Sequence, residues 1–103
     1  LALKPETSVA SVKQYLSMVD VVVVLTVHPG YYGAKFLSAP LKKIKQIKKI
    51  NPNIEVIVDG GMNPLTIKSA VKAGADAVVS GGFITKAADP KKAMRMLKDA
   101  ARD

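Results

Sequence analysis

The sequence has no cysteine and no tryptophan, and its aromatic residues are two phenylalanines and three tyrosines. Without cysteine it has neither disulfide bonds nor thiolates for metal binding or catalysis, which fits a cytoplasmic protein. No apolar run reaches the roughly 18 residues that a membrane-spanning helix needs. The chain begins LALKPETS, with neither an initiator methionine nor a basic leader. We therefore expect no signal peptide, and we expect the chain to be part of a longer protein.

Acidic residues are also scarce: eight, against sixteen lysines and arginines, for a formal net charge of +8. A basic surface attracts anions, nucleic acid among them. However, the lysines concentrate in residues 41–50, LKKIKQIKKI, where Leu41, Ile44 and Ile47 recur at near-helical spacing. Because no aromatic residue or arginine cluster accompanies them, this pattern favours an amphipathic helix with a solvated lysine face. A non-enzymatic nucleic-acid-binding module is kept as an alternative.

Apolar, β-branched segments recur along the chain and predict parallel strands. The three longer ones are almost continuously apolar, which is typical of strands buried on both faces beneath helices. The predicted strands cover residues 1–3, 19–27, 54–59 and 75–80.

The segments between these strands begin with residues that favour helix starts. Ser8 and Ser38 precede the first two predicted helices, and Asn63 and Asp89 each precede a proline at the start of the next two. Gly74 is suited to the left-handed conformation that ends a helix. The predicted helices cover residues 9–18, 39–50, 64–73 and 90–101.

The alternation of strands and helices predicts an α/β fold with right-handed crossovers between parallel strands. Four such units form half of a (β/α)₈ barrel or a small open sheet. A complete barrel takes about 200–250 residues, so residues 1–103 are expected to be a single partial domain. The free edges of such a half barrel lead us to expect self-association.

Glycines follow each of the three longer predicted strands, at what would be one edge of the sheet. Such glycines either form tight turns or let backbone N–H groups approach an anion closely. Their recurrence after all three strands favours a phosphate-binding site, as in barrels whose last loops bind phosphate. The glycines are Gly30, Gly33, Gly60, Gly61, Gly81 and Gly82.

Asp59 ends the third predicted strand. A carboxylate at this position often caps the following helix, but Asn63 is better placed for that role before Pro64. Asp59 is therefore a candidate general base, metal ligand or both. His28, the only histidine, ends the second strand and is more often structural than functional in such a position. Met62 follows the glycines and could contact a ligand.

Three ordered motifs resemble the ribulose-phosphate 3-epimerase family. They are TVHPGYYGAKF at residues 26–36, IEVIVDGGMN at residues 54–63 and AGADAVVSGGFI at residues 73–84. The opening LALKPETSVASVKQYL is similar to the fifth strand and helix of the same family. The resemblance spans the whole chain and implies the C-terminal half of a TIM (β/α)₈ barrel, strands five to eight.

The resemblance implies interconversion of D-ribulose 5-phosphate and D-xylulose 5-phosphate in the cytoplasmic pentose phosphate pathway. One carboxylate removes the C3 proton, a second returns it on the opposite face, and a divalent metal, zinc, iron, manganese or cobalt, stabilises the enediolate. Asp59 would be one of the two acids and a metal ligand. The implied substrate contacts are Gly30, Tyr31, Tyr32, Gly33, Asp59, Gly60, Gly61, Gly81 and Gly82.

The chain departs from the family pattern at several positions. Tyr32 replaces a glycine, Ala34 a glutamine, Gly82 a serine and Leu25 a methionine. A related sugar phosphate is therefore open as the substrate. The family's other metal ligands and its second acid come from earlier strands, so we expect this chain alone to have no appreciable epimerase activity.

Two other enzyme-like interpretations remain. One is another sugar-phosphate barrel enzyme, such as a hexulose-phosphate aldol lyase. The other is a signalling receiver domain, which needs an acidic pair at the end of its first strand, where this chain has LALKPE.

Overall fold

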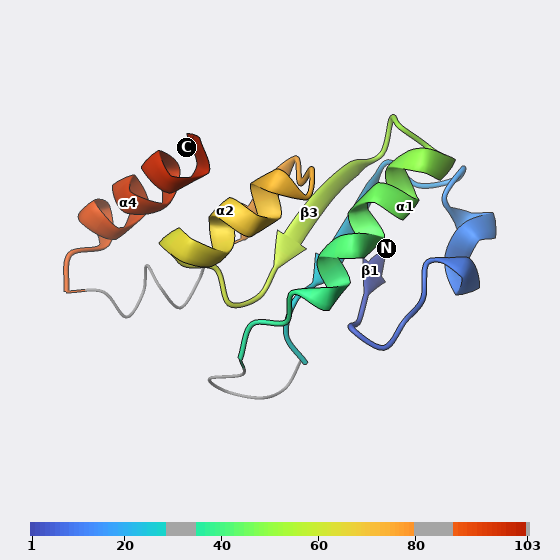
Figure 1. Cartoon of the computed structure of the whole chain (residues 1–103). Coiled ribbons are helices and arrows are strands. Elements are labelled where there is room, and N and C mark those ends of the chain that lie inside the picture. The colour runs from blue at the N-terminus through green and yellow to red at the C-terminus, as the bar shows by residue number, and fades with distance from the viewer. Residues whose placement is uncertain (29–34, 80–87, 103) are drawn as a thin grey trace.

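The computed structural model describes residues 1–28, 35–79 and 88–102. Strands and helices alternate along the described chain, as the sequence predicts (Figure 1). The elements are β1 (Ala2–Leu3), the 3₁₀ helix η1 (Ala10–Tyr15), β2 (Val21–Leu25), the 3₁₀ turn η2 (Ala39–Leu41), α1 (Lys42–Ile50), β3 (Glu55–Asp59), α2 (Pro64–Lys72), β4 (Ala77–Val79) and α4 (Pro90–Arg102).

The four described strands form one parallel sheet in the order β1-β2-β3-β4. Consecutive strands are neighbours, which is the arrangement of a barrel segment. Along the last full row of the ladder, Asp59 pairs with Leu25 on one side and Val79 on the other. The carboxyl ends of β2, β3 and β4 therefore meet at one edge, and the predicted α/β half-barrel topology is confirmed.

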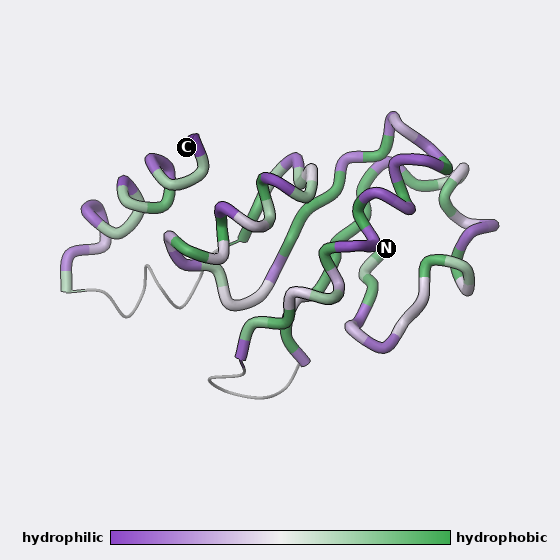
Figure 2. The backbone as a smooth tube through the Cα atoms, in the orientation of Figure 1, coloured by the Kyte–Doolittle hydropathy of each residue, from purple (hydrophilic) through white to green (hydrophobic). Residues whose placement is uncertain are grey.

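One face of the sheet forms the core with the helices. Val22, Val24, Val56 and Val58 are fully buried there, and the helices pack over this face (Figures 1 and 2). Core side chains from the helices include Leu41, Ile44, Ile47, Ile67 and Leu97.

The opposite face is not covered by any described helix, and we call it the open face. Its residues alternate with the buried ones and are only partly buried or exposed. The expectation of strands buried on both faces is therefore wrong for the described residues, because the helices lie on one side only. The open face consists of Ala2, Val21, Val23, Leu25, Glu55, Ile57, Asp59, Ala77 and Val79.

Helix termini agree with the sequence in most places. Asn63 Oδ1 accepts hydrogen bonds from the N–H groups of Leu65 and Thr66, and Thr66 Oγ1 accepts from Asn63 N–H. Gly74 has φ of 102°, and the hydrogen bond from Ala75 N–H to Ala70 O closes the end of α2.

Two helix starts differ from the prediction. Ser38 makes no capping hydrogen bond with its side chain; η2 instead leads directly into α1. After Ser8 the chain forms a 3₁₀ helix, because Ser8 Oγ accepts from Ser11 N–H while Ser11 Oγ donates to Ser8 O. Such local side-chain bonds compete with regular α-helical hydrogen bonding.

The methionines at helical spacing are not core residues. Met18 is 77% exposed, and Met94 and Met96 are each 45% exposed. On α4 the buried positions are Ala93, Leu97 and Ala100, so the neighbouring methionines turn toward solvent. Met62, by contrast, is buried at the end of the β3 turn.

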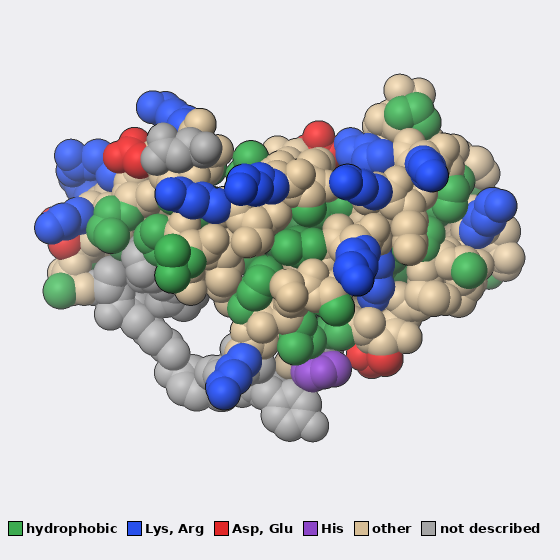
Figure 3. All heavy atoms as spheres, in the orientation of Figure 1, with side chains coloured by type: hydrophobic (Ala, Val, Ile, Leu, Met, Phe, Trp, Pro, Cys, Tyr) green, Lys and Arg blue, Asp and Glu red, His purple; other side chains and the backbone are tan. Residues whose placement is uncertain are grey.

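The lysine-rich segment forms the predicted amphipathic helix. Leu41, Ile44 and Ile47 are buried, and lysines line the helical side of the molecule (Figure 3). Two lysines hold backbone: Lys43 Nζ donates to Lys4 O and Pro5 O, and Lys48 Nζ donates to Ile54 O. Among the described helices, none has the length and apolarity that crossing a bilayer requires.

Candidate active site

Asp59 is the last residue of β3 and lies on the open face at the carboxyl edge of the sheet. It shares this face with Ile57 and is partly buried. In parallel α/β sheets, ligands bind at this edge. The position therefore makes the Asp59 carboxylate available to a small molecule held above the sheet.

Gly60 and Gly61 turn the chain sharply away from β3. Their φ values are 126° and 70°, which glycine adopts more easily than other residues. A Cβ on Gly60 would lie 2.7 Å from Val27 Cγ2, and a Cβ on Gly61 would lie 3.0 Å from Phe36 Cβ. The turn therefore requires both glycines because of its backbone conformation and because the segments on either side of residues 29–34 lie close to it.

The same turn keeps its backbone donors available. Within residues 1–28, 35–79 and 88–102, neither Gly60 N–H nor Gly61 N–H has a hydrogen-bond acceptor. The two readings of this glycine pair, tight turn and anion cradle, are thus compatible at these positions.

Thr26 is a polar residue of this site that the sequence analysis did not single out. It is fully buried; its Oγ1 donates to Gly60 O at 2.6 Å and approaches Asp59 O at 3.2 Å. Its N–H donates to Asp59 O at 2.9 Å. Thr26 therefore fixes the peptide groups on both sides of the Asp59–Gly60 bond. The signal in the sequence was one hydroxyl within the apolar run VVVVLTV.

Several expected site residues lie outside the described residues, and their roles stay predictions. They are Gly30, Tyr31, Tyr32, Gly33, Gly81 and Gly82.

His28 follows β2 and does not join Asp59 in a described cluster. Its Nδ1 lies 3.8 Å from Glu6 Oε2, and both side chains are more than half exposed. Lys43 holds the chain beside Glu6; burial lowers the pKa of Lys43, and the Glu6 carboxylate opposes that change. Among the residues that the structure describes, no three His, Asp or Glu side chains are grouped closely enough to hold a metal ion. Asp59 alone does not form a metal site.

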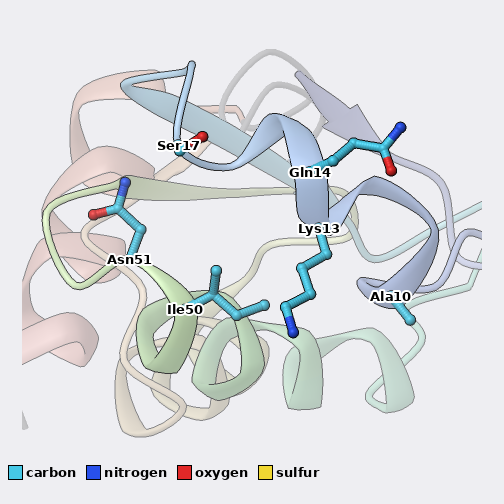
Figure 4. Close-up of a pocket in the computed structure, with 6 residues that line it drawn as sticks. All are labelled: Ala10, Lys13, Gln14, Ser17, Ile50 and Asn51. Carbon is cyan, nitrogen blue, oxygen red and sulfur yellow. The ribbon is translucent and has the colours of Figure 1, made fainter.

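A cavity of about 510 Å³ lies far from this edge, between η1 and the end of α1. Figure 4 shows Lys13 extending from η1 toward α1, while Gln14 points away. Asn51 Nδ2 donates to Leu16 O there, so this residue has a structural role. Because Ser17 and Asn51 precede β2 and β3, the cavity is at the amino edge of the sheet and does not contribute to the Asp59 site. It is lined by Ala10, Lys13, Gln14, Ser17, Ile50 and Asn51.

Sequence comparisons match the whole length of the chain to one group of proteins. The model of the Ribulose-phosphate 3 epimerase family matches residues 1–85. A ribulose-phosphate 3-epimerase of Eremothecium gossypii is 36% identical over 99% of this chain and 43% of its own length. One from Methanocaldococcus jannaschii is 38% identical over 98% of this chain and 45% of its own. The chain thus spans less than half the length of these curated relatives.

Solved structures share the same fold. A 3-hexulose-6-phosphate synthase structure superposes with a TM-score of 0.72 and 25% identity, covering 96% of this chain and 47% of that one. An orotidine 5'-phosphate decarboxylase from Pyrococcus horikoshii superposes with a TM-score of 0.67 over 99% of this chain and 48% of that one. At 21% identity the second likeness shows the fold alone. The chain corresponds to about half of each structure.

Proposed function

Because the chain belongs to the ribulose-phosphate 3-epimerase family, we propose that it is part of an enzyme that interconverts D-ribulose 5-phosphate and D-xylulose 5-phosphate. The observation that carries the proposal is a family match that includes VDGG, with its aspartate at the carboxyl edge of the sheet. The activity is assigned to a whole protein, since the chain spans less than half of its curated relatives.

Asp59 is proposed as one of the two acid–base groups. The C3 proton of the substrate is acidic because the neighbouring C2 ketone accepts the negative charge as an enediolate. A carboxylate at the sheet edge can remove that proton, and a second on the opposite face of the substrate can return one. Thr26 holds the Asp59 backbone, which limits the positions that the carboxylate can reach.

The resemblance implies a divalent metal ion, zinc, iron, manganese or cobalt, that would stabilise the enediolate charge. Asp59 is its candidate ligand on this chain. The described residues supply no cluster that fits a metal, so the remaining ligands have to come from elsewhere in the whole protein.

The substrate phosphate is proposed to bind the glycine-rich loops at the same edge. The support is the positive φ of Gly60 and Gly61 and the absence of acceptors for their N–H groups within the described part of the chain. Backbone N–H groups in such turns bind anions. The other proposed contacts are Gly30, Tyr31, Tyr32, Gly33, Gly81 and Gly82.

A cytoplasmic location and a place in the pentose phosphate pathway are part of the same proposal. A rice relative that is 36% identical is named as a cytoplasmic isoform, whereas an Arabidopsis thaliana relative is named as chloroplastic. Fractionation of cells that produce the tagged protein would distinguish the two locations.

A ¹⁵N–¹H titration of the chain with D-ribulose 5-phosphate tests the phosphate cradle. We expect the amide resonances of Gly60 and Gly61 to shift together and saturate, because the phosphate binds their N–H groups. D-ribulose without the phosphate is the matched control and should leave them in place. Asp59→Asn should keep the phosphate-dependent shifts, since it changes no backbone donor. A well-dispersed spectrum that neither ligand alters would contradict the cradle.

A related sugar-phosphate enzyme is the second candidate function. The 25% identity and TM-score of 0.72 to 3-hexulose-6-phosphate synthase favour it to that extent. The same titration with a hexulose 6-phosphate separates the candidates: tighter saturation by the hexulose ligand would favour the synthase-like function. The non-enzymatic alternative is nucleic-acid binding, and a groove of about 340 Å³ lined by Lys42, Lys45 and Lys72 is where it would occur.

A further inference from the structure

The open face is apolar over most of its area although no described helix covers it. Val21 is 36% exposed and Val79 is 47% exposed, and Val23, Leu25 and Ile57 lie between them on the same face. Parallel sheets in proteins are almost always covered on both faces. The open face therefore needs a partner that covers apolar surface.

The two outer strands of the sheet are also unpaired on one side within the described chain. β1 pairs with β2 alone, and β4 pairs with β3 alone. Because all four strands run in the same direction, β4 of one copy can continue the ladder through β1 of another copy in parallel. A partner that covers the open face must also satisfy the backbone groups of these two edges.

The charge distribution allows two copies to meet through their open faces. Five lysines lie on α1, two on α2 and five lysines and arginines on α4, whereas Asp99 is the one acidic residue of these three helices. Figure 3 shows the cationic side chains spread over the helical side. The charged residues of the open face are Glu55 and Asp59, at opposite ends of β3. Most of the +8 charge thus stays on the outside when open faces meet.

We propose that two copies of this chain close an eight-stranded parallel barrel, with β4 of each copy paired to β1 of the other and both open faces inside. Eight parallel strands with helices outside form a closed and widely used fold, and two copies supply four strands each. The dimer is closed by a two-fold axis, so it leaves no free strand edge. In a longer polypeptide, four preceding βα units would cover the same surface.

The closed dimer has a consequence for the site, which rests on the proposed function. The two-fold axis places the partner's Asp59 at the same end of the barrel as Asp59. The dimer thereby has two carboxylates at one mouth, on opposite sides of the space where a substrate would lie.

Cross-linking between the outer strands tests the arrangement directly, because the chain has no cysteine of its own. Lys4 follows β1, Val79 ends β4, and both are exposed at the carboxyl edge. In the closed dimer, position 4 of one copy neighbours position 79 of the other. Within one copy the two positions are three strand spacings apart, about 14 Å.

The Lys4→Cys/Val79→Cys double variant is treated with a bismaleimide shorter than that separation. We expect a covalent dimer from the double variant and none from Lys4→Cys or Val79→Cys alone, since equivalent positions lie on opposite sides of the barrel. Higher covalent oligomers would indicate open-ended stacking and overturn the closed dimer. Covalent dimers from either single variant would also overturn it.

Light scattering with two matched variants tests the covered surface. Val23→Lys places a charge in the middle of the open face and should raise the dimer dissociation constant at least about tenfold. Leu65→Lys, at an 80% exposed position on α2, should leave it unchanged. A wild-type chain that remains monomeric at high concentration overturns the proposal. Should Val23→Lys fail to fold, the cross-linking result decides. Asp59→Asn should dimerise normally, which keeps this test independent of the enzymatic proposal.

Discussion

At the scale of single residues, the hydroxyl of Thr26 is the contact that most directly shapes the candidate site. It is fully buried and donates to Gly60 O at 2.6 Å. Thr26→Val keeps the shape but leaves that carbonyl without its donor, so we expect a loss of about 1–3 kcal/mol in the free energy of unfolding. Thr26→Ser keeps the hydroxyl and should lose less. Urea denaturation measures both, and equal losses for the two variants would show that the methyl group, not the hydrogen bond, is responsible.

Residue-scale features were predictable where local chemistry decides them. Asn63 caps α2 and Gly74 ends it, as their types and neighbours indicate. Thr26 was not recognised because its partners lie on β3 and the following turn, more than thirty residues away. The same applies to Gly60: its position after a strand suggested a turn, but its close approach to Val27 depends on how β2 and β3 align.

At the scale of elements, Asp76 links three segments at the amino edge of the sheet. Its Oδ2 accepts from Lys48 Nζ of α1 at 2.6 Å and from Val56 N–H of β3 at 2.8 Å. The hydrogen bond from Lys48 is the main cause that lowers the pKa of Asp76, and the Val56 N–H adds to it. This carboxylate joins the end of α1 to the start of β3 and to the segment before β4.

The lowered pKa predicts how stability depends on pH. The contribution of Asp76 is fully present above its unfolded-state pKa of about 3.9 and is lost as the pH falls through the lower folded-state value. Asp76→Asn should therefore be less stable than the wild type at neutral pH, and the difference should shrink below about pH 4. Because the side chain is 41% exposed, solvent screening keeps the effect small. Thermal unfolding across this range measures it, with Asp99→Asn as the charge-matched control; a difference that grows on acidification would contradict the assignment.

Element types were more predictable than element faces. The spacing of Leu41, Ile44 and Ile47 identified a helix and its buried side. The strands were recognised from their β-branched residues, yet two-sided burial was wrong, because Val21 and Val79 on the open face remain exposed. Continuous hydrophobicity indicates that both faces avoid water in the complete assembly; it does not indicate which polypeptide covers them.

At the scale of the whole molecule, the described chain contains one half of what the proposed reaction needs. Epimerisation at C3 requires proton transfer on two faces of the substrate, and the candidate site has one carboxylate, Asp59. The described residues hold no metal cluster, and the chain spans 43% of the Eremothecium gossypii relative. The half-barrel topology was predictable from alternation and length, whereas the partner surface follows only from the observed faces and edges.

This incompleteness predicts that the 103-residue chain, although it presents Asp59, has no appreciable epimerase activity by itself. A dimer closed through the open faces adds a second carboxylate but no further described metal ligand, and losing metal stabilisation of the enediolate removes several kcal/mol of transition-state stabilisation. The measurement is conversion of D-ribulose 5-phosphate followed by a coupled xylulose 5-phosphate assay, with and without added divalent metal. The control is Asp59→Asn: turnover in the wild-type chain that this substitution abolishes would show that the half barrel is sufficient. Turnover that survives the substitution would point to a contaminating enzyme, and the prediction of an inactive chain would stand.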